Sequence, residues 1–272
     1  MNSQQSRRFF LQSLGAAVVG AHLDHEGVMA VRHTEGHRIA GCELATSASL
    51  DAMEAFYRDR LELTTGRTSG RLTVTAGDTR IVFIEDRQAA SPFYHFAFNI
   101  PENKIVAARE WQLARSPLLP IPERNRAAGL PPDIVDYSHW NAHSIFFLDP
   151  GGNVVEYIAR HDLKNAAAGA FSSRDILGTS EIALIVDDVA GTVTRLRSAL
   201  ALEPYRGSSA DFAALGDETG LVLIMRRGRI LNFNAASQEK AARVYATAVQ
   251  LRGSGASILR LGGFPYEIRT TG

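Results

Sequence analysis

The sequence has a single cysteine, Cys42, so it cannot form an internal disulfide framework. It also lacks an excess of either charge, since lysine and arginine together number 29 and aspartate and glutamate together number 29. A formal net charge of zero gives no sign of nucleic acid or an anionic membrane as a partner. The apolar run at residues 14–21 is far shorter than the roughly 20 residues that span a bilayer. We therefore expect neither a disulfide scaffold, nor a nucleic-acid-binding protein, nor a stable membrane span.

What remains is the composition of an ordinary globular protein, with 45% hydrophobic and 21% charged residues. The 272 residues leave room for one large domain or two small ones.

Three stretches of the sequence repeat one pattern, in which a short apolar strand is followed by a turn and an amphipathic helix. The strands are expected at 42–45, 95–98 and 181–184, and the helices at 50–60, 102–114 and 189–200. Overlaying the three copies places Cys42, His95 and Glu181 at the same position. Each unit is too small to bury its own sheet face, so the units are expected to pack on one another.

A second pattern lies at residues 143–157, where two apolar runs flank Asp149-Pro150-Gly151-Gly152. These four residues are typical of a tight turn. The pattern predicts a hairpin with strands at 144–148 and 154–160.

This hairpin and the helical segment at residues 50–61 resemble the vicinal oxygen chelate superfamily, which includes glyoxalase I, fosfomycin- and bleomycin-resistance proteins and extradiol dioxygenases. In that family two βαβββ modules form one cupped, metal-binding barrel. The resemblance implies an α+β fold of repeated βαβββ modules, two of which form such a barrel beside a third, diverged module. We expect the chain to divide into a leader (1–30), a two-module domain (38–160), a linker (161–177), a third module (178–230) and a C-terminal tail (231–272).

The resemblance also implies a divalent metal site, because the family places His, His and Glu ligands on the inward faces of particular strands. His95 and Glu156 match two of these positions, and the alternation of side chains along a strand keeps both of them inward. Cys42 holds the third position, either as a thiolate ligand or as a small apolar core residue. Imidazole and carboxylate ligands together suit Fe²⁺, Mn²⁺, Zn²⁺ or Ni²⁺.

The same residues also allow purely structural interpretations. His95 could instead bond a backbone carbonyl in the core. An unpaired, buried Glu156 would be costly, so a partner is expected, whether a metal, His95 or an arginine. Glu181 occupies the matching position of the third module, but the last strand of that module, at 221–224, offers no carboxylate, so no second metal site is expected there.

Three further features adjoin the expected site. Tyr137, His139 and Trp140 form an aromatic cluster that either lines the pocket or packs in the core. The proline-rich segment 116–132 is expected to be a long loop, a candidate lid or substrate wall. His143 either supports the ligands from behind or lies on the surface.

Two functions are consistent with these residues. One is a metal-dependent lyase or dioxygenase, in which the ion acts as a Lewis acid on a small molecule. The other is a metal-free protein of the bleomycin-resistance type that binds a small molecule in the same cup.

The third module raises the question of what covers its strand edge and apolar face. One answer is the C-terminal tail, with residues 264–268 added as a strand. The other is the same module of a second subunit, in a two-fold symmetric homodimer. We favour the dimer, because the tail is expected to hold no more than a helix at 239–251 and a strand near 264–269.

The N-terminus resembles a twin-arginine export signal, with Arg7 and Arg8 ahead of the weakly apolar run. Small residues suited to cleavage end at Ala21 and at Ala30. The resemblance implies export in folded form to the periplasm or beyond.

Overall fold

The computed structural model describes residues 37–87, 91–230, 241–253 and 255–271, all of which belong to one compact unit, Thr34–Gly272. The expected export signal lies outside the described residues and stays a prediction. No helix in the described part of the chain is long and apolar enough to cross a membrane.

The described residues form three α-helices and fifteen strands. The helices are α1 (Leu50–Glu54), which a π-helical turn (Ala55–Arg60) continues, α2 (Ile105–Leu113) and α3 (Val189–Leu200). The strands are β1 (Arg38–Thr46), β2 (Thr64–Thr68), β3 (Arg71–Ala76), β4 (Thr79–Glu85), β5 (His95–Ile100), β6 (Val135–Tyr137), β7 (Ala142–Leu148), β8 (Val154–Arg160), β9 (Gly178–Val186), β10 (Pro204–Ser209), β11 (Phe212–Asp217), β12 (Gly220–Arg226), β13 (Thr247–Arg252), β14 (Ser257–Arg260) and β15 (Tyr266–Thr271).

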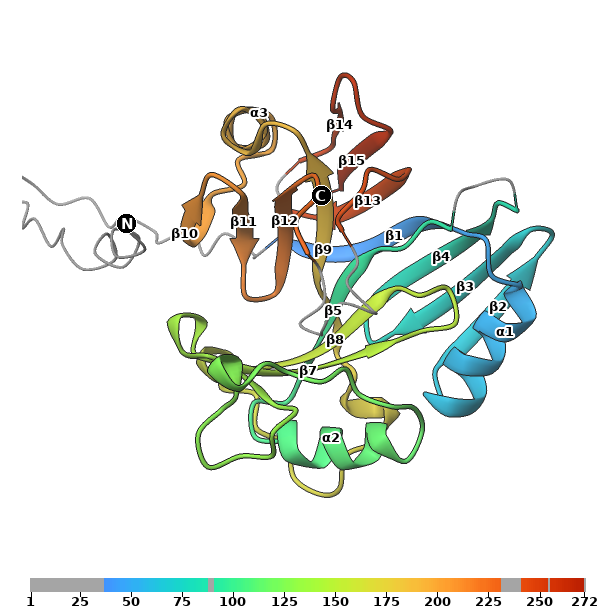
Figure 1. Cartoon of the computed structure of the whole chain (residues 1–272). Helices are drawn as coiled ribbons and strands as arrows, with labels where there is room; N and C mark the ends of the chain where they lie inside the picture. The colour runs from blue at the N-terminus through green and yellow to red at the C-terminus, as the bar shows by residue number, and fades with distance from the viewer. Residues whose placement is uncertain (1–36, 88–90, 231–240, 254, 272) are drawn as a thin grey trace, which may run out of the picture. The chain divides into compact units, whose positions relative to one another are not determined.

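These elements build three βαβββ modules and a shortened fourth (Figure 1). Module 1 contains β1–β4, module 2 β5–β8, module 3 β9–β12, and module 4 only β13–β15. The modules combine in pairs into two sheets. Sheet A has the strand order β14-β15-β13-β1-β4-β3-β2, and sheet B has the order β10-β11-β12-β9-β5-β8-β7-β6. The expected α+β fold of repeated βαβββ modules is confirmed.

The pairing of the modules differs from the expected division, in which residues 38–160 form the two-module domain. Modules 2 and 3 share sheet B through the antiparallel strands β5 and β9, with Ala97 opposite Glu181. Module 1 instead pairs with module 4, through the antiparallel strands β1 and β13. Module 3 therefore has a partner within the chain, which removes the reason for expecting a homodimer at this place and a covering role for residues 264–268.

The difference between the expected and the observed pairing of modules comes from the C-terminal segment. The helix expected at 239–251 is wrong, because β13 occupies Thr247–Arg252. Thr247, Val249 and Leu251 are buried at alternate positions, and this two-residue period is that of a strand with one face in the core. Both sides of β13 are occupied, by β1 and by β15, which makes it an interior strand of sheet A.

Helices with a capping residue and the hairpin with a tight turn lie where the sequence predicts them. Ser49 caps α1 as expected, since its hydroxyl accepts a hydrogen bond of 3.2 Å from the backbone N–H of Ala52. Helix α3 spans the expected 189–200, and the side chain of Asp188 caps it by accepting from the N–H of Gly191 at 3.0 Å. The hairpin at 144–160 is also present, as β7 and β8.

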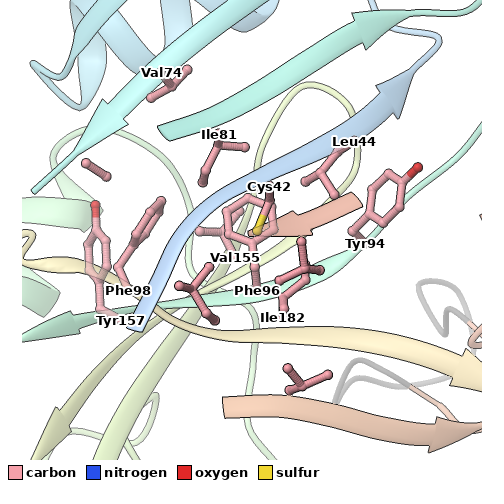
Figure 2. Packing of buried hydrophobic residues seen from close by; sticks show 14 of the residues in the cluster. Cys42, Leu44, Val74, Ile81, Tyr94, Phe96, Phe98, Val155, Tyr157 and Ile182 are labelled. Atoms are coloured by element: carbon pink, nitrogen blue, oxygen red, sulfur yellow. The ribbon is translucent and has the colours of Figure 1, made fainter. Parts of the chain in front are cut away.

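The main core lies between the two sheets, with β1 in contact with β9 and β12. Figure 2 shows Cys42 and Leu44 of β1 among apolar side chains of sheet B, including Phe96, Val155 and Ile182. We call the face of each sheet that carries these residues its core face. The opposite face carries Glu43 in sheet A and Ala97 and Glu156 in sheet B.

Two tyrosine hydroxyls tie the sheets together. The Tyr94 hydroxyl, just before β5, donates to the carbonyl of Ala246 (2.8 Å) and accepts from the N–H of Ala45 in β1 (3.0 Å). In the reverse direction, the Tyr266 hydroxyl of β15 accepts from the N–H of Ile185 in β9 (3.0 Å) and donates to its carbonyl (2.7 Å). Each hydroxyl thus satisfies backbone groups of the other sheet.

Candidate metal centre

Three buried side chains converge on the face of sheet B that lies opposite its core face. His95 comes from β5, Glu156 from β8 and Glu181 from β9, and one ligand atom of each lies within 4.8 Å of the others. The strand register explains the convergence, since Ala97 pairs with Glu156 on one side and with Glu181 on the other. The methyl group of Ala97 therefore separates the two carboxylates and leaves the space beside them open.

His95 is held in the tautomer that a metal ligand needs. Its Nδ1 lies 3.0 Å from the carbonyl oxygen of Val154, which can only accept, so Nδ1 carries the proton. The lone pair of Nε2 then points toward Glu156, whose Oε2 is 3.5 Å away. Burial lowers the pKa of His95, although the charge on Glu181 and the bond to Val154 oppose this. The imidazole is therefore neutral at pH 7.

The charges around the site do not balance. Glu181 pairs with Arg160, which is fully buried and also donates to the Ser180 hydroxyl at 3.1 Å. Within the described ranges, Glu156 has no lysine or arginine as such a counter-ion. Burial and then the charge on Glu181 raise the pKa of Glu156 well above its ordinary value, and Ser144 and Arg160 offset this only in part. Two carboxylates thus share one cation, and the difference must be made up by a proton or a metal.

The donor set fits a divalent ion. Among the described residues, Glu156 Oε1 has no hydrogen-bond partner although it is buried. A neutral imidazole lone pair and a carboxylate oxygen that face each other are both electron donors, and they attract a cation rather than each other. One nitrogen and two carboxylates suit Fe²⁺, Mn²⁺, Zn²⁺ or Ni²⁺. His95, Glu156 and Glu181 would hold such an ion from three sides.

A cavity of about 300 Å³ opens onto these three side chains. Its size lies at the lower end of small-molecule sites. Four aromatic rings supply much of its wall, and polar side chains such as Asn125 and His139 lie among them. The lining residues other than the three candidate ligands are Asn125, Tyr137, His139, Trp140, Phe146, Phe212, Leu223, Met225, Arg229 and Ile230.

The structure brings together two of the three expected ligands, His95 and Glu156, and leaves Cys42 out. Cys42 lies on the core face of sheet A, and its side chain is 3% exposed. Burial raises the pKa of its thiol to about 12, so the thiolate that a metal would need is strongly disfavoured. Cys42 is a small apolar core residue, the second of the two interpretations.

Glu181 lies in the third place of the candidate site, although no metal site was expected in the third module. The connection from the first strand to the helix differs in length between the modules, so a repeat that matches along the helices is out of step along the strands. By the face that it occupies, Glu43 is the counterpart of His95 and Glu181, so Leu44 is the counterpart of Phe96 and Cys42 lies one position before the matching residue. The shared pattern of a charged residue, a large apolar residue and alanine, as in Glu181-Ile182-Ala183, was the available signal.

The expected surroundings are present in part. Tyr137, His139 and Trp140 line the cavity, and the proline-rich loop reaches it through Asn125. His143 is not in the lining. It is half-buried beside His161, with Nδ1 2.7 Å from the Nε2 of that residue.

No protein-family model matches this sequence, and no curated protein matches it. Among solved structures, the chain is similar to a protein from Bacillus subtilis described as a "putative dioxygenase", at 14% identity and a TM-score of 0.52, over 87% of this chain and 86% of that one. It is also similar to glyoxalase I from Zea mays, at 15% identity and a TM-score of 0.50, over 86% of this chain and 92% of that one. The chain has the fold of the vicinal oxygen chelate proteins, as the sequence resemblance implied.

Proposed function

We propose that this protein is a divalent-metal-dependent enzyme that acts on a small molecule bound to the ion through two neighbouring oxygen atoms. The observation that carries this proposal is the convergence of His95, Glu156 and Glu181, with a free imidazole lone pair and one negative charge more than Arg160 can neutralise. Buried groups with strongly shifted pKa values in a cavity are typical of functional sites.

The residues would divide the work as follows. His95, Glu156 and Glu181 hold the ion, which supplies Lewis acidity toward the oxygens of the substrate. Arg160 fixes one side of Glu181 and so orients its carboxylate. Glu156 would ligate as the carboxylate, because the ion would take the place of a proton as the counter-charge. Trp140 and the other aromatic rings of the wall exclude water from the reacting end of the substrate.

The reaction itself is either of the lyase type or of the oxygenase type. Oxygen dependence separates the two, since an oxygenase consumes O₂ in step with substrate and a glyoxalase-like lyase turns over without it. A panel of small molecules with two neighbouring oxygens, tested with and without O₂, would identify the type.

The first experiment is metal analysis of the purified protein, followed by chelation and titration with Fe²⁺, Mn²⁺, Ni²⁺ and Zn²⁺. We expect one ion per chain, lost in His95→Ala and in Glu156→Ala, with circular dichroism that shows the fold intact. A protein that takes up none of the four ions and melts at the same temperature with and without them would contradict the proposal.

The alternative is a metal-free small-molecule-binding protein of the bleomycin-resistance type. Arg160 favours it, because this arginine already neutralises Glu181 from within the chain. A proton on Glu156 would then complete the charge balance. This function predicts ligand binding in the cavity that chelators do not affect.

A further inference from the structure

The register of sheet B sets the charges of the cavity lining apart, because Leu221 at one end of β12 stands opposite Glu181 and Arg229 follows the other end of that strand. The inner end holds the acidic pair Glu156 and Glu181 with His95. Among the residues that the structure describes, the only other lysine, arginine, aspartate or glutamate in the lining is Arg229. Arg229 is exposed, and its guanidinium carbon lies 5.2 Å from the ring centre of Phe212, so it lies along an aromatic part of the wall.

Arg229 differs from its two neighbours in the short basic run that ends β12. Arg226 pairs with Asp211 at 3.3 Å, and Arg227 pairs with Asp187 at 2.7 Å. Among the described residues, no acidic side chain forms such a pair with Arg229. Of the three arginines, the one that lines the cavity is therefore the one whose charge is available to a ligand.

The backbone holds Arg229 in this place. Its carbonyl accepts a hydrogen bond of 2.6 Å from the N–H of Ala242, and the N–H of Gly228 donates to the carbonyl of Ala242 at 2.8 Å. Gly228 has a φ of 86°, a left-handed conformation that favours glycine and turns the chain after Arg227. Because Gly228 and Arg229 are both bonded to Ala242, the backbone position of Arg229 beside the cavity is set by the fold.

The space between the two ends suits a flat, apolar body. Trp140, Phe146 and Phe212 contribute rings to the lining, and Leu223 and Met225 contribute aliphatic surface, beside the polar Asn125 and His139. Roughly 150 Å³ is enough to hold benzene in a protein, so about 300 Å³ accommodates one ring with substituents at both ends.

From this arrangement we propose that the natural ligand is an organic anion with a flat, apolar body, and that its anionic group pairs with Arg229 at the end of the cavity away from His95, Glu156 and Glu181. This inference rests on the proposed function, because it assigns the other end of the molecule to the metal centre. A guanidinium recognises a carboxylate through two parallel hydrogen bonds, which gives both affinity and orientation.

The test compares two probes that differ only in charge, 3,4-dihydroxybenzoate and its uncharged amide, 3,4-dihydroxybenzamide. Binding is measured by calorimetry on Zn²⁺-loaded protein, since zinc is redox-inert and allows no oxygenation. We expect the acid to bind about tenfold more tightly than the amide to the wild-type chain. In Arg229→Gln this ratio should fall to near one, and in Arg226→Gln it should stay at the wild-type value.

Equal affinity for acid and amide in the wild-type protein would overturn the inference without any variant. A tenfold ratio that survives Arg229→Gln would also overturn it, because another group would then hold the anion. Metal uptake is recorded separately on the same samples. If no zinc binds, the proposed function fails on that measurement, and the ratio of acid to amide on the metal-free protein still decides whether Arg229 selects an anion.

Discussion

Sheets A and B share one arrangement of strands and present different chemistry on the faces that lie away from the core. In sheet B this face holds His95 and two carboxylates among buried apolar residues such as Ala97 and Phe146. In sheet A, Glu43 occupies the position of the histidine, is half exposed, and pairs with Arg71 at 3.5 Å. The hollow there is smaller, about 200 Å³.

Burial accounts for the difference in what the two faces can do. A carboxylate in water keeps its charge at little cost and holds a metal weakly, because water competes for both. A buried carboxylate is destabilised unless a cation lies beside it. A buried pair of carboxylates therefore favours the binding of a metal ion. One position shows the difference in sequence. Ile84 of β4 stands opposite Ala45 of β1 in sheet A, and the corresponding pair in sheet B is Glu156 opposite Ala97.

The largest expected effect is the loss of stability on removing the arginine that pairs with an acidic side chain in each sheet. Arg160→Met should destabilise the metal-free protein by about 3–5 kcal/mol, because it leaves Glu181 buried without its counter-charge. The matched change in sheet A, Arg71→Met, breaks a half-exposed pair and should change stability by less than about 1 kcal/mol. Urea unfolding after chelation measures both. Similar losses for the two variants would show that burial does not distinguish the two faces.

Metal affinity should separate the two acidic residues. Glu181→Gln removes a ligand and should weaken Zn²⁺ or Ni²⁺ binding by at least about 100-fold. Glu43→Gln, the counterpart in sheet A, should leave the affinity unchanged. Calorimetric titration of both variants is the measurement, with circular dichroism to confirm the fold. A loss of affinity in Glu43→Gln would place an ion in sheet A as well.

The tyrosine ties should contribute about equally to the two sheets. Tyr94→Phe and Tyr266→Phe each leave one backbone N–H and one carbonyl without the hydroxyl that now satisfies them, part-buried groups in the first case and buried groups in the second. We expect each change to cost about 1–3 kcal/mol in the free energy of unfolding. A double variant whose cost differs from the sum would show that the two ties act together.

The smallest expected effect is that of Cys42. Cys42→Ala should leave metal affinity unchanged, because this residue lies in the core between the sheets rather than at the site. In the wild-type protein the thiol should react with iodoacetamide only as the chain unfolds, since it is buried and its pKa is raised to about 12. Rapid labelling of the folded protein would contradict the core position.

Much of the fold could be predicted because the strongest signals are local. Ser49 and Asp188 mark helix starts through their own side chains, and the turn at Asp149 is fixed by the residues around it. Which modules pair could not be predicted in this way, because strand pairing depends on residues far apart in the chain. The sequence around Val249 reads as a strand only once β1 and β15 flank it.

Two of the three candidate ligands could be predicted, again because the signals for them are local. His95 and Glu156 lie on parallel neighbouring strands of one module, so the repeat pattern brings them together. Glu181 and Arg160 join them only through the contact between modules 2 and 3. The prediction also depended on which face of the sheet each side chain occupies. Aligning the repeats one position out replaces Glu43 with Cys42, whose side chain points to the opposite face.

Modules 2 and 3 pair with each other, and modules 1 and 4 pair around them in the sequence. This pairing sets the order in which the growing chain can complete its sheets. The strands of sheet B end with β12, so the three candidate ligands can come together while the C-terminal part is still being made. β1 must wait for β13, as the pairing of Arg38 with Arg252 shows. Until then module 1 carries an open strand edge and half of the main core, both of which favour aggregation. Loss of the last strands should therefore harm the first module, at the far end of the sequence, more than the modules beside them.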